Sequence, residues 1–176
     1  MCTTRTILIF PQIENAEIID ELRSRYDPLA PLIRPHITLA FPFETDWSAD
    51  RVQGILTDVA RDVAPFELRL SGLSRQSDAF GHWLFLNLSD ETGALSLLHR
   101  QLYADGLRAF RPAAAFVPHM TLGRFETAKA MERAWATERS RELNFETRID
   151  SIAVERIGAR GESIVETTYM LKEEFP

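Results

Sequence analysis

The chain has 176 residues, of which 45% are hydrophobic, and it carries a formal net charge of −6. This length and composition suit one domain, or two closely fused lobes, and exclude a disordered chain. Cys2 is the single cysteine, which excludes an intrachain disulfide and a cysteine metal cluster. No dense basic tract offsets the acidic balance. Since proteins that grip long nucleic acids carry a basic face, we expect no extended nucleic-acid footprint.

No apolar run approaches the roughly 18 residues of a membrane-spanning helix. The apolar stretch near the N-terminus is too short for a signal peptide and lacks a small-residue cleavage site. We therefore expect a cytoplasmic protein that makes no contact with a membrane.

The first half of the chain predicts five elements in the order strand, helix, strand, helix, strand. These elements cover residues 6–10, 13–26, 37–43, 48–64 and 66–71. Apolar residues at helical spacing indicate the helices, and β-branched or alternating apolar residues indicate the strands. Ser48 is a suitable N-cap for the second helix, and Pro65 ends that helix.

The second half of the chain repeats this order and adds one strand. Its elements cover residues 83–88, 91–110, 120–125, 127–141 and 143–157, followed by a final strand over 163–171. Thr127 is a suitable N-cap for the second of these helices, and a turn at 158–161 is expected to pair the final strand with its predecessor. The repeat predicts a two-lobed α+β fold with mixed or antiparallel sheets.

Two of the four histidines lie in the same pentapeptide, Pro-His-x-Thr-Leu, at residues 35–39 and 118–122. Side chains two residues apart share one face of a strand, so each histidine points the same way as the threonine of its motif. The two pairs are His36 with Thr38 and His119 with Thr121. Each motif therefore places an imidazole and a hydroxyl side by side on a rigid element.

Two such pairs suit the transfer of a phosphodiester. The reaction needs one base and one acid, and an imidazole with an unperturbed pKa of roughly 6.5 serves in either role. A threonine hydroxyl can donate to a phosphate oxygen as charge develops in the transition state. Two histidines without a motif-linked carboxylate or cysteine form a poor zinc ligand set, so we expect no metal. Because the two motifs are alike, either histidine could be the base.

The tandem His-x-Thr motifs, each flanked by Pro and Leu, resemble those of the 2H phosphoesterase superfamily. The resemblance covers nearly the whole chain in length, order of elements and motif spacing. It implies α+β architecture with two pseudo-symmetric lobes, each a small, mostly antiparallel sheet with helices outside, around a central cleft. It also implies a single bilobal domain over 1–176, with an approximate repeat of 5–75 and 82–157 and the final strand at 163–171. The residues that match the family's catalytic tetrad are His36, Thr38, His119 and Thr121.

The same resemblance implies a metal-independent enzyme without a cofactor. It would open the 2′,3′-cyclic phosphate of a small nucleotide or RNA end to a 2′-phosphate, with 2′-5′ ligation as the reverse reaction. The physiological substrate and the relevance of ligation stay open, and we expect a monomer. The alternative is a non-catalytic module that binds nucleotides or RNA ends in the same cleft. Against it, simple phosphate binding is better served by Arg, Lys or helix N-termini than by neutral histidines.

Four further residues are candidates for substrate binding. Arg124 closely follows the second motif, and strict strand alternation turns it away from the motif threonine unless Gly123 permits a bulge. Trp83 and Phe43 offer aromatic faces to a base, with burial in the core as the alternative for each. Arg34 precedes the first motif and either lends positive charge to the cleft or lies in a solvated loop.

Overall fold

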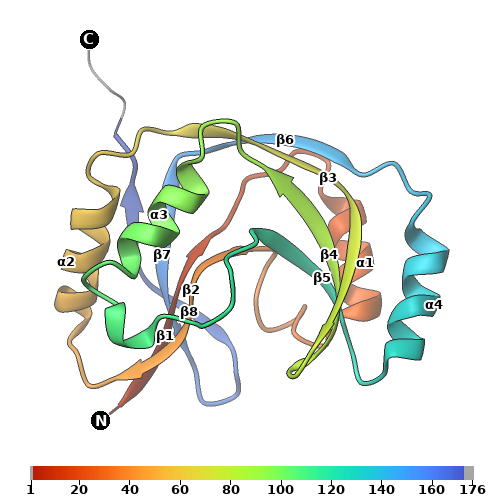
Figure 1. Cartoon of the computed structure of the whole chain (residues 1–176), viewed down its shortest axis with the longest axis horizontal. Coiled ribbons are helices and arrows are strands. Elements are labelled where there is room, and N and C mark those ends of the chain that lie inside the picture. Colours follow the sequence, from red (N-terminus) through yellow and green to blue (C-terminus); the bar gives the residue numbers. More distant parts are fainter. Residues whose placement is uncertain (1, 173–176) are drawn as a thin grey trace.

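Eight strands form one sheet in the order β6-β3-β4-β5-β2-β1-β7-β8, in a computed structural model that describes residues 2–172 (Figure 1). All neighbouring strands are antiparallel. The strands are β1 (Thr3–Ile9), β2 (Ile37–Thr45), β3 (Phe66–Asp78), β4 (Gly81–Ser89), β5 (His119–Phe125), β6 (Asn144–Ile149), β7 (Ser151–Ile157) and β8 (Ser163–Met170). The helices are α1 (Glu17–Tyr26), α2 (Ala49–Ala60), α3 (Ala94–Leu102) and α4 (Ala128–Glu138), with a short 3-10 helix, η1, at Arg108–Phe110. The predicted α+β class is confirmed.

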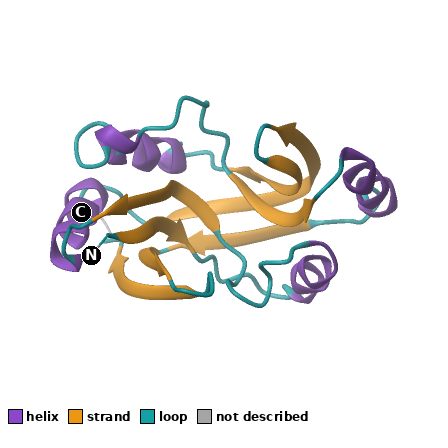
Figure 2. Ribbon diagram, turned by 90° about the horizontal axis from the view of Figure 1, so that it is seen from below, coloured by secondary structure: helices purple, strands orange, loops and turns teal. Residues whose placement is uncertain are grey.

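The sheet consists of two four-stranded halves that meet between β2 and β5. A single register pair, Ile37 with Met120, joins these two strands. Helices α2 and α3 lie beside the half that contains β2, and α1 and α4 lie beside the half that contains β5, so the helices gather at the two ends of the molecule (Figures 1 and 2). Each lobe combines segments from both halves of the chain, because α1 packs against β5 and α3 packs against β2.

The apolar residues of the two motif strands anchor those strands in the core. Ile37, Leu39, Met120 and Leu122 are all 0% exposed. Complete burial of each such side chain contributes about 1.5–3 kcal/mol of transfer free energy. Since neighbouring side chains of a strand point to opposite faces, this burial directs the motif histidines and threonines away from the core.

The predicted N-caps of α2 and α4 are confirmed. The Ser48 hydroxyl accepts a hydrogen bond from the Arg51 amide at 3.3 Å, and the Thr127 hydroxyl accepts one from the Ala130 amide at 3.2 Å. Caps of this kind contribute about 1 kcal/mol each. The predicted pairing of the final strand with its predecessor is also confirmed, as the antiparallel β7–β8 pair.

The helix predicted over 91–110 is wrong at both ends. Gly93 adopts a left-handed conformation, with φ of 72°, and α3 begins only after it. The helix ends at Leu102, and the chain then turns against α2, where a Cβ on Gly106 would clash with the Ile55 side chain. The sequence predicts one continuous helix because its apolar residues keep a helical spacing from α3 into η1.

The strand predicted over 143–157 is two strands. β6 pairs with β3 at one edge of the sheet, whereas β7 pairs with β1 in the other half, and Asp150 separates them. The helix predicted over 13–26 begins later, at Glu17, after Asn15 adopts a φ of 57°. No helix within residues 2–172 combines the length and apolar character needed to cross a membrane.

Candidate active site

The two motifs lie next to each other at the junction of the lobes. In an antiparallel pair, the neighbours of a paired residue also face each other, so the Ile37–Met120 register sets His36 beside Thr121 and Thr38 beside His119. All four side chains are half-buried and lie on the face opposite the core. The imidazoles and hydroxyls are therefore related by an approximate twofold through the junction.

Each motif histidine is held by a carbonyl two residues earlier in the chain. The Nδ1 of His36 lies 2.9 Å from the Arg34 oxygen, and the Nδ1 of His119 lies 2.8 Å from the Val117 oxygen. A carbonyl only accepts hydrogen bonds, so Nδ1 carries the proton in both rings. The Nε2 atom of each neutral ring is then left with a lone pair, as a general base requires.

The surroundings of the two rings favour the neutral imidazole. The pKa of His36 is lowered to about 4, chiefly by burial and in smaller part by the nearby guanidinium groups of Arg23 and Arg124. Burial also lowers the pKa of His119, again with a contribution from Arg124. Phe85 stacks on the His119 ring at 3.8 Å between centroids, and this apolar contact contributes to the desolvation.

A β-bulge turns Arg124 toward this face. Thr121 and Gly123 pair with consecutive residues of β4, so Leu122 is the extra residue of β5. Leu122 and Gly123 are both buried, and alternation resumes with Arg124 on the face of His119 and Thr121. The bulge that the sequence left open is thus present.

The first motif strand contains the corresponding bulge. Thr38 and Ala40 pair with consecutive residues of β1, which makes Leu39 the extra residue of β2. Leu39 and Ala40 are both 0% exposed, and Phe41 is 42% exposed. The fifth residue after each motif histidine therefore lies on the tetrad's face, as an arginine in one lobe and a phenylalanine in the other.

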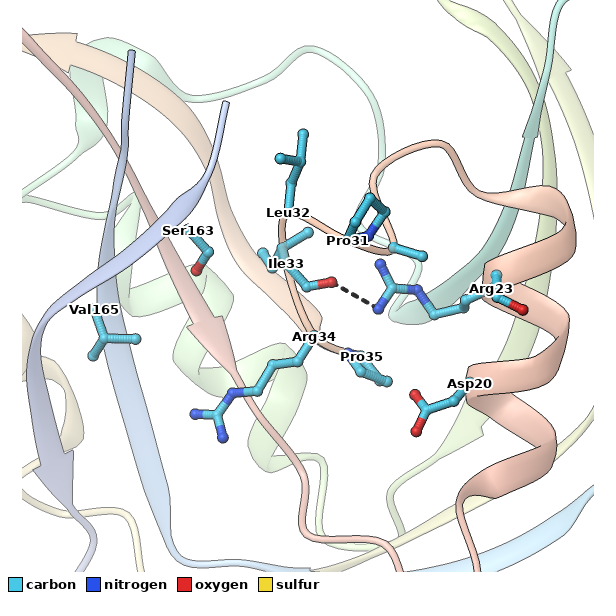
Figure 3. A pocket seen from close by; sticks show the side chains of 11 residues that line it. Asp20, Arg23, Pro31, Leu32, Ile33, Arg34, Pro35, Ser163 and Val165 are labelled. Carbon is cyan, nitrogen blue, oxygen red and sulfur yellow. Dashed lines mark hydrogen bonds between the residues drawn. The ribbon is translucent and has the colours of Figure 1, made fainter. Parts of the chain in front are cut away.

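Arg124 lies beside a buried ion pair, Arg23 with Asp27, that the sequence analysis missed. The Asp27 carboxylate lies 3.4 Å from Arg124 Nε, and Asp27 in turn accepts hydrogen bonds from Arg23 Nε and Nη2 at 3.1 and 2.9 Å. Arg23 also donates to the Ile33 carbonyl at 2.8 Å (Figure 3). The available signal was the position of Arg23, which falls on the apolar stripe of α1 beside Leu22.

Two further predicted substrate-binding residues, Trp83 and Arg34, each lie against a different partner. Trp83 is half-buried, and the Arg124 guanidinium lies 5.0 Å from the centre of its ring. Arg34 is exposed and lies 4.1 Å over the Phe10 ring. Its side chain lines a cavity of about 730 Å³ between α1, the loop before β2 and β8 (Figure 3).

Phe43 lies in the core, not at the site. It is 2% exposed and packs against Phe110, with 5.4 Å between ring centroids. A second register shift in β2, between Ala40 and Phe43, returns Phe43 to the core face after the bulge at Leu39 has directed Phe41 to the tetrad's face. Phe43 therefore has no free face for a substrate. Within the described part of the chain, no group of three or more His, Cys, Asp or Glu side chains is arranged to hold a metal ion.

Comparison with known proteins identifies the family. Residues 10–160 match the model of the 2′-5′ RNA ligase superfamily. A Bacillus pumilus protein named "Putative phosphoesterase" is 30% identical over 169 residues, which cover 96% of this chain and 97% of that protein. A Bacillus licheniformis protein of the same designation is 31% identical over 147 residues, covering 82% and 84%. The chain belongs to the 2′-5′ RNA ligase superfamily of 2H phosphoesterases, as its two motifs predicted.

Solved structures of this fold are similar over almost the whole chain. Escherichia coli LigT complexed with 3′-AMP aligns with a TM-score of 0.64 at 17% identity and covers 98% of this chain and all of its own. TT0787 of Thermus thermophilus aligns with a TM-score of 0.65 at 18% identity over the same shares. At these identities, the likeness establishes the fold alone.

Proposed function

We propose that this phosphoesterase opens 2′,3′-cyclic phosphates of nucleotides or RNA ends to 2′-phosphates, with 2′-5′ ligation as the reverse reaction. One observation carries the proposal. Two imidazoles in matched strands have the same tautomer, fixed by hydrogen bonds from Nδ1 to backbone carbonyls, and each has a threonine on its face. A reaction with one base and one acid on either side of a phosphorus needs this arrangement.

In the proposed reaction, the Nε2 of one neutral histidine takes a proton from water while the water oxygen forms a bond to phosphorus. The bond between phosphorus and O3′ breaks, and O3′ receives the proton carried by Nε2 of the other histidine, which is an imidazolium. The phosphate stays on O2′. Either histidine of the pair His36 and His119 can be the base, since both have the same tautomer.

The charge of the substrate supplies the protonated partner. In the absence of ligand, burial and arginines lower the pKa of both histidines, with Arg124 acting on each. A bound phosphate offsets those guanidinium charges and favours an imidazolium beside it. Hydrogen bonds from Thr38, Thr121 and Arg124 to the non-bridging oxygens then stabilise the charge that develops in the transition state.

Aromatic side chains near the tetrad suit a nucleobase. Phe41 and Trp83 both have exposed ring surface, and stacking on such a ring contributes about 1–3 kcal/mol per base. Arg34 offers a further positive charge. Structures of LigT complexed with 3′-AMP and with ATP support a small nucleotide as ligand of this fold. We propose that the partner is a small nucleotide or an RNA end, bound by a monomer.

The test is hydrolysis of 2′,3′-cyclic mononucleotides and of short RNAs with a cyclic end. We expect His36→Ala and His119→Ala each to lower kcat by roughly 10²–10⁴-fold, and a chelator to have no effect. His82→Ala is the matched control, because His82 bonds to Ser77 across the paired strands of the β3–β4 hairpin. Full activity of both tetrad variants, or loss of activity with chelator, would refute the mechanism. Tight binding of a 2′-phosphonucleotide without any turnover would favour the binding module.

A further inference from the structure

A second cavity, of about 360 Å³, lies between α3 and the segment that leads to the second motif. Three residues of α3 and its C-terminus line one side, and the segment 111–116 lines the other. The α3 side consists of His99, Arg100 and Tyr103. None of these residues belongs to the tetrad, and the proposed reaction uses none of them.

The cavity is positively charged in a protein whose net charge is negative. Arg100 and Arg111 both line it, and its lining contains no Asp or Glu. Both guanidinium groups belong to exposed side chains, and neither forms an ion pair within residues 2–172. Two unneutralised guanidinium groups around one hollow favour a phosphate, which accepts hydrogen bonds from both.

Two stacked aromatic rings, those of His99 and Phe116, line the cavity. The rings of His99 and Phe116 stack at 3.9 Å between centroids with an interplanar angle of 7°. His99 Nδ1 donates to the Leu39 carbonyl at 2.8 Å, so the Nε2 atom is left for another partner. Burial and the nearby Arg111 lower the pKa of His99, and a bound anion would oppose the effect of Arg111.

The residues that line the cavity are connected to both motif strands, by hydrogen bonds to β2 and along the chain to β5. On the β2 side, His99 bonds to Leu39, and the Tyr103 hydroxyl accepts from the Phe41 amide at 3.1 Å. On the β5 side, the segment 111–116 continues directly into Val117, whose carbonyl holds His119 at 2.8 Å. A ligand in the cavity would therefore contact residues that are directly connected to the two motif strands.

We propose that this cavity binds a phosphate group between Arg100 and Arg111, at a site separate from the tetrad. The phosphate belongs either to a nucleotide of the substrate beyond the cyclic end or to a free phosphate compound. Binding itself stands apart from the proposed reaction, and only the first source rests on the proposed function.

Binding is tested with inorganic phosphate on the full chain, by following the amide resonances of 111–116. We expect these resonances to shift in the wild type and in Arg133→Ala, which removes an exposed arginine of α4. The Arg100→Ala/Arg111→Ala variant should need at least about ten-fold more phosphate for the same shift, and the double lysine variant should retain most of the response. The tetrad amides serve as an internal reference, since phosphate that binds there shifts them in every variant. Resonances of 111–116 that do not respond, or that respond equally in the double alanine variant, would overturn the proposal.

The source of the phosphate is tested by activity. If the substrate supplies it, the double alanine variant raises KM for a dinucleotide with a cyclic end and leaves KM for the cyclic mononucleotide unchanged. If a free compound supplies it, added phosphate changes the kinetics of both substrates in the wild type, beyond its competition at the tetrad, and the variant lacks this change. An enzyme that turns over neither substrate would contradict the proposed function, and the amide shifts would still decide whether the cavity binds phosphate.

Discussion

Asp27 and Arg124 form an ion pair between the C-terminus of α1 and β5, with 3.4 Å between the Asp27 Oδ1 and the Arg124 Nε. The carboxylate is 1% exposed, and its other oxygen accepts two hydrogen bonds from Arg23. One buried carboxylate thus lies between a guanidinium of α1 and a guanidinium of β5. The pairing fixes the arginine beside the tetrad to the helix that covers its strand.

Replacement of Asp27 by Asn should destabilise the protein strongly. The change leaves the buried Arg23 guanidinium without a counter-charge, and breaking a buried pair in this way costs about 3–5 kcal/mol. The unfolding free energy from urea titration measures the effect. Asp58→Asn is the control, because its ion pair with Arg61 is exposed and should contribute less than about 1 kcal/mol. Equal losses in the two variants would contradict a structural role for the Asp27 pair.

Removal of Arg124 should raise the pKa of both motif histidines. The guanidinium lowers the pKa of His36 and of His119, so Arg124→Gln removes a charge that disfavours both imidazolium forms. Titration of the ring resonances by NMR measures each pKa without any substrate. Arg75→Gln, which loses a surface pair with Glu132, should move neither histidine. If neither histidine pKa changed in Arg124→Gln, the prediction would be contradicted, because the guanidinium would then be too far from the imidazoles to affect their pKa.

The pH dependence of kcat/KM should reflect the lowered pKa values of His36 and His119. The free enzyme needs one protonated and one neutral histidine, and His36 has a pKa of about 4 while that of His119 is also lowered. Above both values the active form declines, so kcat/KM should be highest on the acid side of roughly 6.5, the ordinary pKa of histidine. Because bound phosphate favours the imidazolium, the kcat profile should lie at higher pH than the kcat/KM profile. A kcat/KM optimum above neutrality would contradict this scheme.

Phe41 and Phe43 should respond in opposite ways to replacement by Ala. Phe41 is 42% exposed beside the tetrad, so its loss should raise KM for nucleotides about ten-fold and leave stability nearly unchanged. Phe43 is 2% exposed in the core, so its loss should cost about 3–5 kcal/mol of unfolding free energy. Steady-state kinetics and thermal unfolding of the two variants form a matched test. The reverse pattern would contradict the register of β2 against β1.

Gly123 should tolerate no side chain, because the bulge of β5 is tightly packed. A Cβ at this position would lie 2.9 Å from both Phe125 and Tyr26. Gly123→Ala should therefore cost about 1–3 kcal/mol and displace Arg124, which lowers kcat. Gly54→Ala is the control, since a Cβ there meets open space within α2 and should stabilise the protein by about 0.5–1 kcal/mol. Equal stability of the two variants would show that the bulge relaxes around the added methyl.

Several features could be predicted from the sequence because local rules determine them. Period-two alternation places each histidine with its threonine, and the buried leucines of both motifs confirm the facing of the strands. Ser48 and Thr127 cap their helices through bonds that span three residues. The family follows from two repeated pentapeptides, which the comparison confirms.

The remaining features depend on contacts between segments distant in the chain, which no local pattern reports. The break at Asp150 exists because β6 and β7 pair with strands in opposite halves of the sheet. Register against β1 and β4 creates the bulges at Leu39 and Leu122, which direct Phe41 and Arg124 to the tetrad's face. A second register shift against β1 returns Phe43 to the core.

The two motifs by themselves thus determined the reaction class and the pairing of each imidazole with a hydroxyl. Only the tertiary structure brought the pairs together, through the single register pair of Ile37 with Met120. It alone also joined Asp27 to Arg124, because the helix that carries the carboxylate packs on a strand about a hundred residues later. The type of each side chain is known from the sequence. The face of the strand on which a side chain lies after a bulge, however, depends on strand register, and the charges near it depend on helix packing.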